Sequence, residues 1–172
     1  MGRKSEAARR VLVVRAILVI LYIIPPLEAQ SRPSLIGTWK LIAVVAEDSS
    51  GVRDSAPYGP DPTGFITYTP EGRMMAIISY GGRKPLSVPD RQAAPVTERA
   101  EAFGSFLAYA GKYTISGDTV VHHVEAASLQ NWVGTDLIRV VRREGDRIVL
   151  RTPQVSVNAR ARRFELIWQR LQ

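Results

Sequence analysis

The last third of the chain alternates short strand-like runs with tight turns, and this spacing restricts the possible folds most. Ser116-Gly117-Asp118 and Glu144-Gly145-Asp146 have the composition of tight turns. Connections this short join neighbouring strands in antiparallel order, because a parallel pair needs a crossover of about a dozen residues or more. The runs predicted as strands by their apolar and β-branched residues are 112–115, 119–127, 136–143, 147–152 and 163–171.

The middle of the chain continues this pattern with one interruption. Residues 36–46, 64–69 and 73–80 are also predicted to be strands. Between the last two, Thr69-Pro70-Glu71-Gly72 has proline and glycine where a tight turn favours them. Glycines and prolines exclude regular structure from residues 81–96.

One short helix is predicted over residues 97–109, with Thr97 as its N-cap. Phe103, Phe106 and Leu107 give it an apolar stripe, so we expect it to close one end of a barrel or to pack on its side. About eight strands are enough to close a barrel with room for one small ligand. The predicted fold class is therefore all-β: a closed antiparallel up-and-down β-barrel with one short helix, preceded by an N-terminal signal segment.

The N-terminal segment has the order of a secretory signal peptide. Residues 1–10 are rich in basic side chains, residues 11–24 are almost wholly apolar, and Pro25-Pro26 follows. The apolar run is shorter than the roughly 20 residues that a membrane-spanning helix needs, and Arg15 interrupts it.

We therefore expect cleavage after Ala29. Residues 1–29 are then a signal peptide, and residues 30–172 form the barrel domain, in the periplasm or outside the cell. No stable membrane span is expected after cleavage. An uncleaved N-terminal anchor is the alternative.

Composition excludes several classes of chemistry. The chain has no cysteine, so disulfides, thiol nucleophiles and thiolate metal sites are excluded. Much of the net charge of +7 falls in the predicted signal segment, and the remainder is spread along the chain. Arg160, Arg162 and Arg163 form the densest basic run, in a predicted loop. Nucleic-acid binding needs clustering on one face, so we expect no nucleic-acid partner, and we also expect no cofactor.

Several segments carry a family resemblance. Gly37-Thr38-Trp39 resembles the G-x-W signature of the calycin group. The order and spacing of four further segments, from about Leu35 to Arg170, resemble the bacterial and fungal lipocalin-like domain family. The resemblance implies a calycin-type barrel and implies little about its chemistry. The four segments are 64–74, 109–113, 121–125 and 131–134.

Trp39 and Arg170 are predicted to form a structural pair. They lie on the first and last strands, which become neighbours when a meander closes. The resemblance implies that a tryptophan at the closed end of the barrel is covered by an arginine, and Arg170 is the candidate. Stacking of this kind contributes about 0.5–2 kcal/mol. A ligand contact by Trp39 is the alternative.

Two adjacent histidines, His122 and His123, stand in one predicted strand with Glu125. Alternation sends one histidine into the barrel and the other outward, and the apolar neighbours of His122 favour it as the inward one. His123 and Glu125 share a face and can hydrogen-bond, which is a possible arrangement for acid–base catalysis. A solvated face with a cross-strand partner such as Arg139 or Arg142 is the alternative. Adjacent histidines on opposite faces cannot chelate one ion, so no metal site is predicted.

Aromatic residues on the strands and on one loop can line a pocket and offer a hydrogen bond each. Trp132 is the candidate for the pocket rim, because a large ring in a loop is otherwise unexplained. Each of these rings can equally be ordinary barrel packing. The predicted ligand-binding set is Tyr68, Tyr80, Tyr113, His122, Trp132, Phe164 and Trp168.

Three functions remain open from the sequence. The first is an exported protein that binds a small apolar or amphipathic molecule in the barrel lumen. The second is a cofactor-independent isomerase or cyclase that uses a lumen histidine, with His122, His123 and Glu125 as its catalytic candidates. The third is an interaction module whose barrel is filled by side chains such as Met74 and Met75. The sequence favours binding over catalysis and says nothing about oligomeric state.

Overall fold

The computed structural model describes residues 34–157 and 159–172, so the predicted signal segment and its cleavage site lie outside the described residues. The predicted strands are confirmed, most of them to within a few residues of their bounds. Two short strands, β2 and β9, were not predicted. The strands are β1 (Gly37–Asp48), β2 (Arg53–Asp54), β3 (Thr63–Tyr68), β4 (Arg73–Ser79), β5 (Phe106–Ser116), β6 (Thr119–Ala127), β7 (Asp136–Glu144), β8 (Arg147–Arg151), β9 (Val155–Val157) and β10 (Arg160–Arg170).

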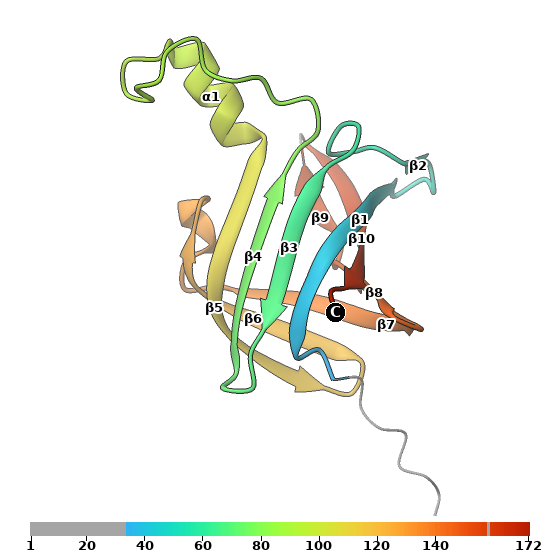
Figure 1. Cartoon of the computed structure of the whole chain (residues 1–172). Helices are drawn as coiled ribbons and strands as arrows, with labels where there is room; N and C mark the ends of the chain where they lie inside the picture. Colours follow the sequence, from blue (N-terminus) through green and yellow to red (C-terminus); the bar gives the residue numbers. More distant parts are fainter. Residues whose placement is uncertain (1–33, 158) are drawn as a thin grey trace, which may run out of the picture. The chain divides into compact units, whose positions relative to one another are not determined.

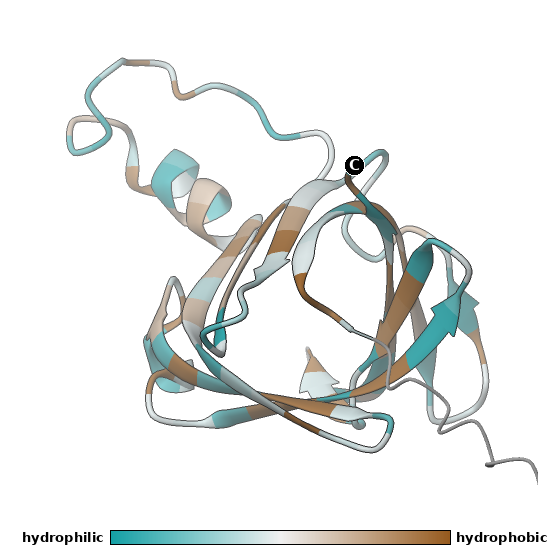
Figure 2. Cartoon of the chain, turned by 60° about the horizontal axis from the view of Figure 1, so that its bottom comes forward, coloured by the Kyte–Doolittle hydropathy of each residue, from teal (hydrophilic) through white to brown (hydrophobic). Residues whose placement is uncertain are grey.

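The sheet closes on itself. Its strand order is β2-β1-β3-β4-β5-β6-β7-β8-β10-β9, and β1 also pairs with β10. Every pairing is antiparallel. Figure 2 shows the long strands forming a ring. The predicted closed antiparallel barrel is therefore confirmed, with β2 and β9 as short additions.

The helix differs from its prediction. Helix α1 spans Val96–Gly104, and Phe106 already pairs with Ser79 of β4. The residues from Phe106 onward therefore belong to β5, where they pair with β4, although the spacing of Phe103, Phe106 and Leu107 also suits a helix. Thr97 does not cap the helix: the N-cap position is Pro95, without a side-chain hydrogen bond.

Helix α1 does not plug the barrel. None of its residues, all within the described part of the chain, is buried. It stands beside the end of β5, next to the long loop that follows β4 (Figure 1). A short 3₁₀ turn, η1 (Gln130–Trp132), lies between β6 and β7. The basic run Arg160–Arg163, predicted to be a loop, lies in β10.

The two ends of the barrel are built differently. The tight connections β3–β4, β5–β6 and β7–β8 all lie at one end, as an up-and-down order requires. The longer connections lie at the other end and include α1, η1 and β9. Trp39, near the start of β1, and its register partner Arg170 lie at the end with the tight turns.

Inward side chains from all the long strands fill the barrel. Alternation along β1, β3, β4, β6 and β10 buries one face of each strand, whereas three consecutive residues of β8, Ile148 to Leu150, are buried. Met74 lies inside the barrel, whereas Met75 is exposed on its outer face. Among the described residues, His122 and Thr152 are the buried polar side chains.

Candidate functional site

A cavity of about 40 Å³ lies inside the barrel, toward the end with the long connections. Its walls combine aliphatic and aromatic side chains with a few polar groups, as binding pockets do. Its volume suits a water molecule rather than an organic ligand. The lining residues are Tyr58, Ile66, Ile78, Leu107, Tyr109, Trp132, Arg139, Leu150, Thr152, Leu166 and Trp168.

Larger hollows lie outside the barrel. One of about 160 Å³ lies between α1 and the loop after β4, where Gly82, Arg83 and Lys84 line it. None of its lining residues is buried. The internal cavity is the better candidate site, because it is enclosed by the barrel and the buried polar side chain of Thr152 and the buried indole N–H of Trp168 line it.

Arg139 brings a positive charge to the internal cavity. Along β7 the outward residues Ile138 and Val140 are exposed, whereas Arg139 is half-buried, opposite the fully buried Val120 of β6. One guanidinium nitrogen, Nη1, donates to the backbone oxygen of Ile138 at 2.8 Å. No carboxylate of the described residues forms an ion pair with Arg139.

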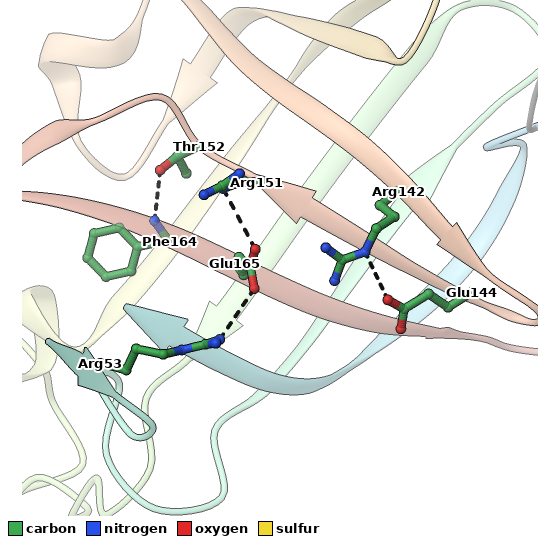
Figure 3. A network of polar contacts seen from close by, with 7 residues as sticks. All are labelled: Arg53, Arg142, Glu144, Arg151, Thr152, Phe164 and Glu165. Carbon is green, nitrogen blue, oxygen red and sulfur yellow. Dashed lines mark hydrogen bonds and ion pairs between the residues drawn. The ribbon is translucent and has the colours of Figure 1, made fainter. Parts of the chain in front are cut away.

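Arginines on the outer face of the barrel contrast with Arg139. Glu165 on β10 lies 3.6 Å from Nη2 of Arg53 on β2 and 3.7 Å from Nε of Arg151 on β8 (Figure 3). It thus contacts the adjacent strand β8 on one side and reaches β2, beyond β1, on the other. Arg142, three residues beyond Arg139, pairs with Glu144 at 2.9 Å. These outer charges have counter-ions from the chain itself, and the inner one has none among the described residues.

Trp168 adds a buried donor to the same cavity. Its side chain is only 1% exposed, and its indole Nε1 has no hydrogen-bond partner among the described residues. Trp39, the other fully buried tryptophan, donates its Nε1 to the Leu35 carbonyl oxygen at 2.8 Å. Thr152 is held in place because its Oγ1 accepts from the Phe164 N–H at 3.0 Å (Figure 3).

His122 points into the barrel, as expected, and is fully buried. Nε2 lies 2.8 Å from the Tyr68 hydroxyl, and Nδ1 lies 3.1 Å from the Tyr109 hydroxyl. Burial lowers the pKa of His122 to about 3, and the positive charge of Arg139 and the neighbouring His123 act in the same direction. The ring is therefore neutral at pH 7, with one nitrogen donating to a tyrosine oxygen and the other accepting from a tyrosine hydroxyl.

The tyrosines around His122 are also neutral. Burial raises the pKa of Tyr68 and of Tyr109, although the Arg139 cation opposes both changes. Burial also raises the pKa of Tyr58. None of these groups supplies a negative charge to Arg139 at pH 7.

His123 and Glu125 lie on the outside of the barrel and do not pair with each other. His123 Nδ1 lies 2.7 Å from an Asp136 oxygen, and Nε2 lies 3.0 Å from the Thr114 hydroxyl. Glu125 accepts two hydrogen bonds from Arg73, at 2.9 and 2.6 Å. The predicted His123–Glu125 pair and the suggested partners Arg139 and Arg142 were therefore wrong. His122, His123 and Glu125 do not form one site.

Side chains from loops close the mouth of the cavity. Tyr58 stacks on Tyr80 with ring centroids 4.2 Å apart and packs against Phe164 at 5.8 Å. Trp132, in η1, meets the Tyr109 ring edge-on at 5.7 Å. Tyr58, Tyr80 and Trp132 lie in connections, outside the barrel strands.

The opposite end is closed by Trp39 and Arg170. The guanidinium of Arg170 lies over the Trp39 ring, 5.0 Å from its centroid, and Nη2 donates to the Ile36 carbonyl oxygen at 2.6 Å. A side chain on Gly37 would come within 3.0 Å of that Nη2, and Gly37 has a φ of 125°, so glycine is required there. Tyr113 donates its hydroxyl to the Thr69 carbonyl oxygen at 2.9 Å.

The predicted ligand-binding residues divide between three places. Trp132 and Trp168 line the cavity, and His122 and Tyr68 lie next to it in the hydrogen-bond network. Phe164 and Tyr80 pack against Tyr58 at its mouth, and Tyr113 lies toward the closed end.

Of the lining residues, only Trp132 and Trp168 were predicted as ligand contacts. The aromatic and polar lining residues that the sequence analysis did not assign to the site are Tyr58, Tyr109, Arg139 and Thr152. Alternation along β7 could have identified Arg139, which shares a face with Leu137 and Val141.

Two further observations concern the described residues alone. They contain no group of three or more His, Asp or Glu side chains that could hold a metal ion. No helix among them has the length and apolar character needed to span a bilayer.

A protein-family match agrees with this architecture. A family model described as a lipocalin-like domain matches residues 36–171. The chain is 38% identical over 84 residues to the 4'-hydroxy-3'-methoxypropiophenone carrier protein ppsC of Aspergillus oryzae, a match that covers 43% of this chain and 75% of that protein. The chain is also similar to the crystal structure of secretory abundant heat soluble protein 4 from Ramazzottius varieornatus. That match covers 80% of this chain and 95% of the other, with 12% sequence identity and a TM-score of 0.38. The family match spans the whole barrel, and the chain therefore belongs to the lipocalin-like domain family.

Proposed function

We propose that this protein binds a small aromatic or amphipathic molecule in the barrel lumen. The observation that carries the proposal is a pair of donors that line one internal cavity: the buried Trp168 Nε1, which has no hydrogen-bond partner among the described residues, and the half-buried Arg139 guanidinium, which has no ion-pair partner among them. Buried polar groups normally have partners, and a missing partner costs about 1–3 kcal/mol. A bound molecule that supplies an acceptor would remove that cost.

The size of the cavity requires that binding displaces side chains. Tyr58, Tyr80 and Trp132 belong to connections, which move more easily than strands. Rotation of these rings away from the mouth would enlarge the space enclosed by Tyr109, Arg139 and Trp168. The ligand then takes the place of the stacked rings, so the apolar surface that they bury stays covered.

The carrier protein from A. oryzae supports an aromatic ligand. Its name identifies its cargo as an aryl ketone with a hydroxyl and a methoxy group on the ring. The cavity here has walls that suit a flat ring, with Trp132 and Tyr109 in edge-to-face contact.

The test is a titration with the neutral fluorescent dye N-phenyl-1-naphthylamine. We expect saturable binding by the full-length protein, with one dye per chain. Leu107→Trp fills the cavity and should weaken binding by about tenfold or more. Ile77→Trp adds the same ring to the outer face of β4, where Ile77 is 45% exposed, and should leave binding unchanged. Absence of dye binding by the wild type, or equal binding by both variants when circular dichroism shows them folded, contradicts the proposal.

Export is the second part of the proposal. The order of basic, apolar and Pro-Pro residues in segment 1–29 supports a signal peptide that directs the barrel to the periplasm or to the medium. The protein would then act as a carrier or scavenger outside the cytoplasm.

A further inference from the structure

The half-buried Arg139 guanidinium lines the internal cavity and has no counter-ion among the described residues. One of its nitrogens donates to the Ile138 carbonyl oxygen, which leaves most of its five N–H groups available. Moving an unpaired charge into a partly buried site costs free energy, which an opposite charge can offset. Arg139 lies on the same face of β7 as Leu137 and Val141, a position where an aliphatic residue would pack at lower cost.

The groups around Arg139 are donors or neutral. Trp168 contributes an N–H and no acceptor. The hydroxyls of Tyr68 and Tyr109 already share His122, whose two ring nitrogens they occupy. The cavity therefore combines positive charge, an unused donor and aromatic walls, and among the described residues it contains no negative charge.

We propose that the lumen ligand carries a deprotonated oxygen, as a carboxylate or acidic phenol attached to an aromatic ring, and that Arg139 and the Trp168 N–H bind that oxygen. This inference rests on the proposed function and specifies the ligand class. A guanidinium holds two oxygens of a carboxylate in a planar fork, which a neutral ketone or alcohol cannot reproduce. The ring would lie against Tyr109, on the side of the long connections.

The experiment compares two probes that differ only in charge. Naphthalene-2-carboxylate and its methyl ester are titrated by calorimetry into the full-length protein at pH 7.5, where the acid is ionised. We expect the carboxylate to bind at least about tenfold more tightly than the ester, as expected for a hydrogen bond to a charged group.

Arg139→Gln should remove this difference by weakening carboxylate binding about tenfold while leaving the ester unchanged. Arg142→Gln is the matched control: it removes a positive charge from the same strand but on the outer face, where Arg142 pairs with Glu144 (Figure 3). It should leave both affinities at the wild-type value. Trp168→Phe should weaken carboxylate binding to a smaller extent, since it removes one neutral donor.

Several results overturn the inference. The inference is wrong if the wild-type protein binds the carboxylate and the ester with equal affinity. This comparison needs no variant, so it remains valid if Arg139→Gln does not fold. The inference is also wrong if Arg139→Gln and Arg142→Gln lose carboxylate binding equally, because the loss then reflects the net charge of the protein rather than a contact with Arg139. If the neutral dye binds and the carboxylate does not, the ligand class is wrong and the proposed function stands. If neither binds, the proposed function fails too.

Discussion

The hydroxyl of Tyr68 lies 2.8 Å from Nε2 of His122, inside the barrel, and the hydroxyl of Tyr109 lies 3.1 Å from the other ring nitrogen, Nδ1. Tyr68 comes from β3, His122 from β6 and Tyr109 from β5. The three side chains thus connect strands across the barrel interior and fix the position of Tyr109 at the cavity. The arrangement requires a neutral His122, because one ring nitrogen must accept a hydrogen bond from a tyrosine hydroxyl while the other donates one.

Stability should therefore fall as the pH falls below the ordinary pKa of histidine. The pKa of His122 is 6.5 in the absence of the fold and about 3 within it. The stabilisation from a neutral His122 is fully present above pH 6.5, and decreases by up to about 1.4 kcal/mol per pH unit below that, because the unfolded chain takes up a proton that the folded chain does not. Urea denaturation at pH 7.5 and pH 5.0 measures the change.

Two variants assign this pH dependence to one side chain. His122→Gln should lower stability at pH 7.5 and flatten the decline between the two pH values. His123→Gln, on the outer face beside Asp136, should retain the wild-type decline. A decline that survives in His122→Gln would show that another group causes it.

Arg170→Ala should lower the melting temperature without changing ligand affinity. The substitution removes the stacking of the guanidinium on Trp39 and the hydrogen bond to Ile36, with an expected loss of about 1–2 kcal/mol, or roughly 3–8 °C. The cavity lies toward the other end of the barrel, so dye binding at 20 °C should be unchanged. A variant with unchanged melting and weaker dye binding would place the ligand at the Trp39 end.

Gly111→Ala should destabilise the barrel strongly. A Cβ at Gly111 would meet the backbone oxygen of His123, and backbone atoms cannot move aside as a flexible side chain does. Gly111 also lies at the shift of register between β5 and β6, where a bulge sets the direction of the strand. We expect a loss of about 2–4 kcal/mol in chemical denaturation.

Gly104→Ala is the control for that experiment. Gly104 is the last residue of α1, and an added Cβ there would have nothing within 4 Å. It should change stability by less than about 1 kcal/mol. Similar losses for Gly104→Ala and Gly111→Ala would contradict the packing argument.

Export can be checked by mass spectrometry of the protein produced in its native host. Cleavage after Ala29 predicts a mature chain that begins at Gln30, recovered outside the cytoplasm. Recovery of a full-length species from the soluble cytosol would contradict the signal-peptide prediction. A full-length species in the membrane fraction would favour the uncleaved anchor.

The strands could be predicted because the turns between them have distinctive chemistry. β6 spans Thr119–Ala127, the range predicted from the turn before it and its run of valines. The proximity of Trp39 and Arg170 also follows from the sequence, since closure of a meander makes the first and last strands neighbours. The end of α1 could not be predicted, because the residues from Phe106 onward suit a helix locally and their pairing with β4, which makes them a strand, is a contact between distant parts of the sequence.

The site was harder to predict than the fold, because it depends on register and on loops. Glu125 pairs with Arg73, two strands away, and nothing local in the sequence indicates that contact. The bulge between Ala110 and Gly111 displaces the pairing at that point. Tyr58 reaches the cavity mouth from a loop rich in glycine and proline, where no periodic pattern gives the direction of a side chain.

The unequal ends of the barrel have a consequence for how such proteins can diversify. The end with the tight turns holds Trp39, Arg170 and the short connections, so substitutions there change whether the chain folds. The cavity mouth is built from Tyr58, Tyr80 and Trp132 on longer connections, where insertions and replacements cost little backbone pairing. If the lumen binds a small molecule as proposed, the chemistry of that molecule can change among relatives while the barrel itself is retained.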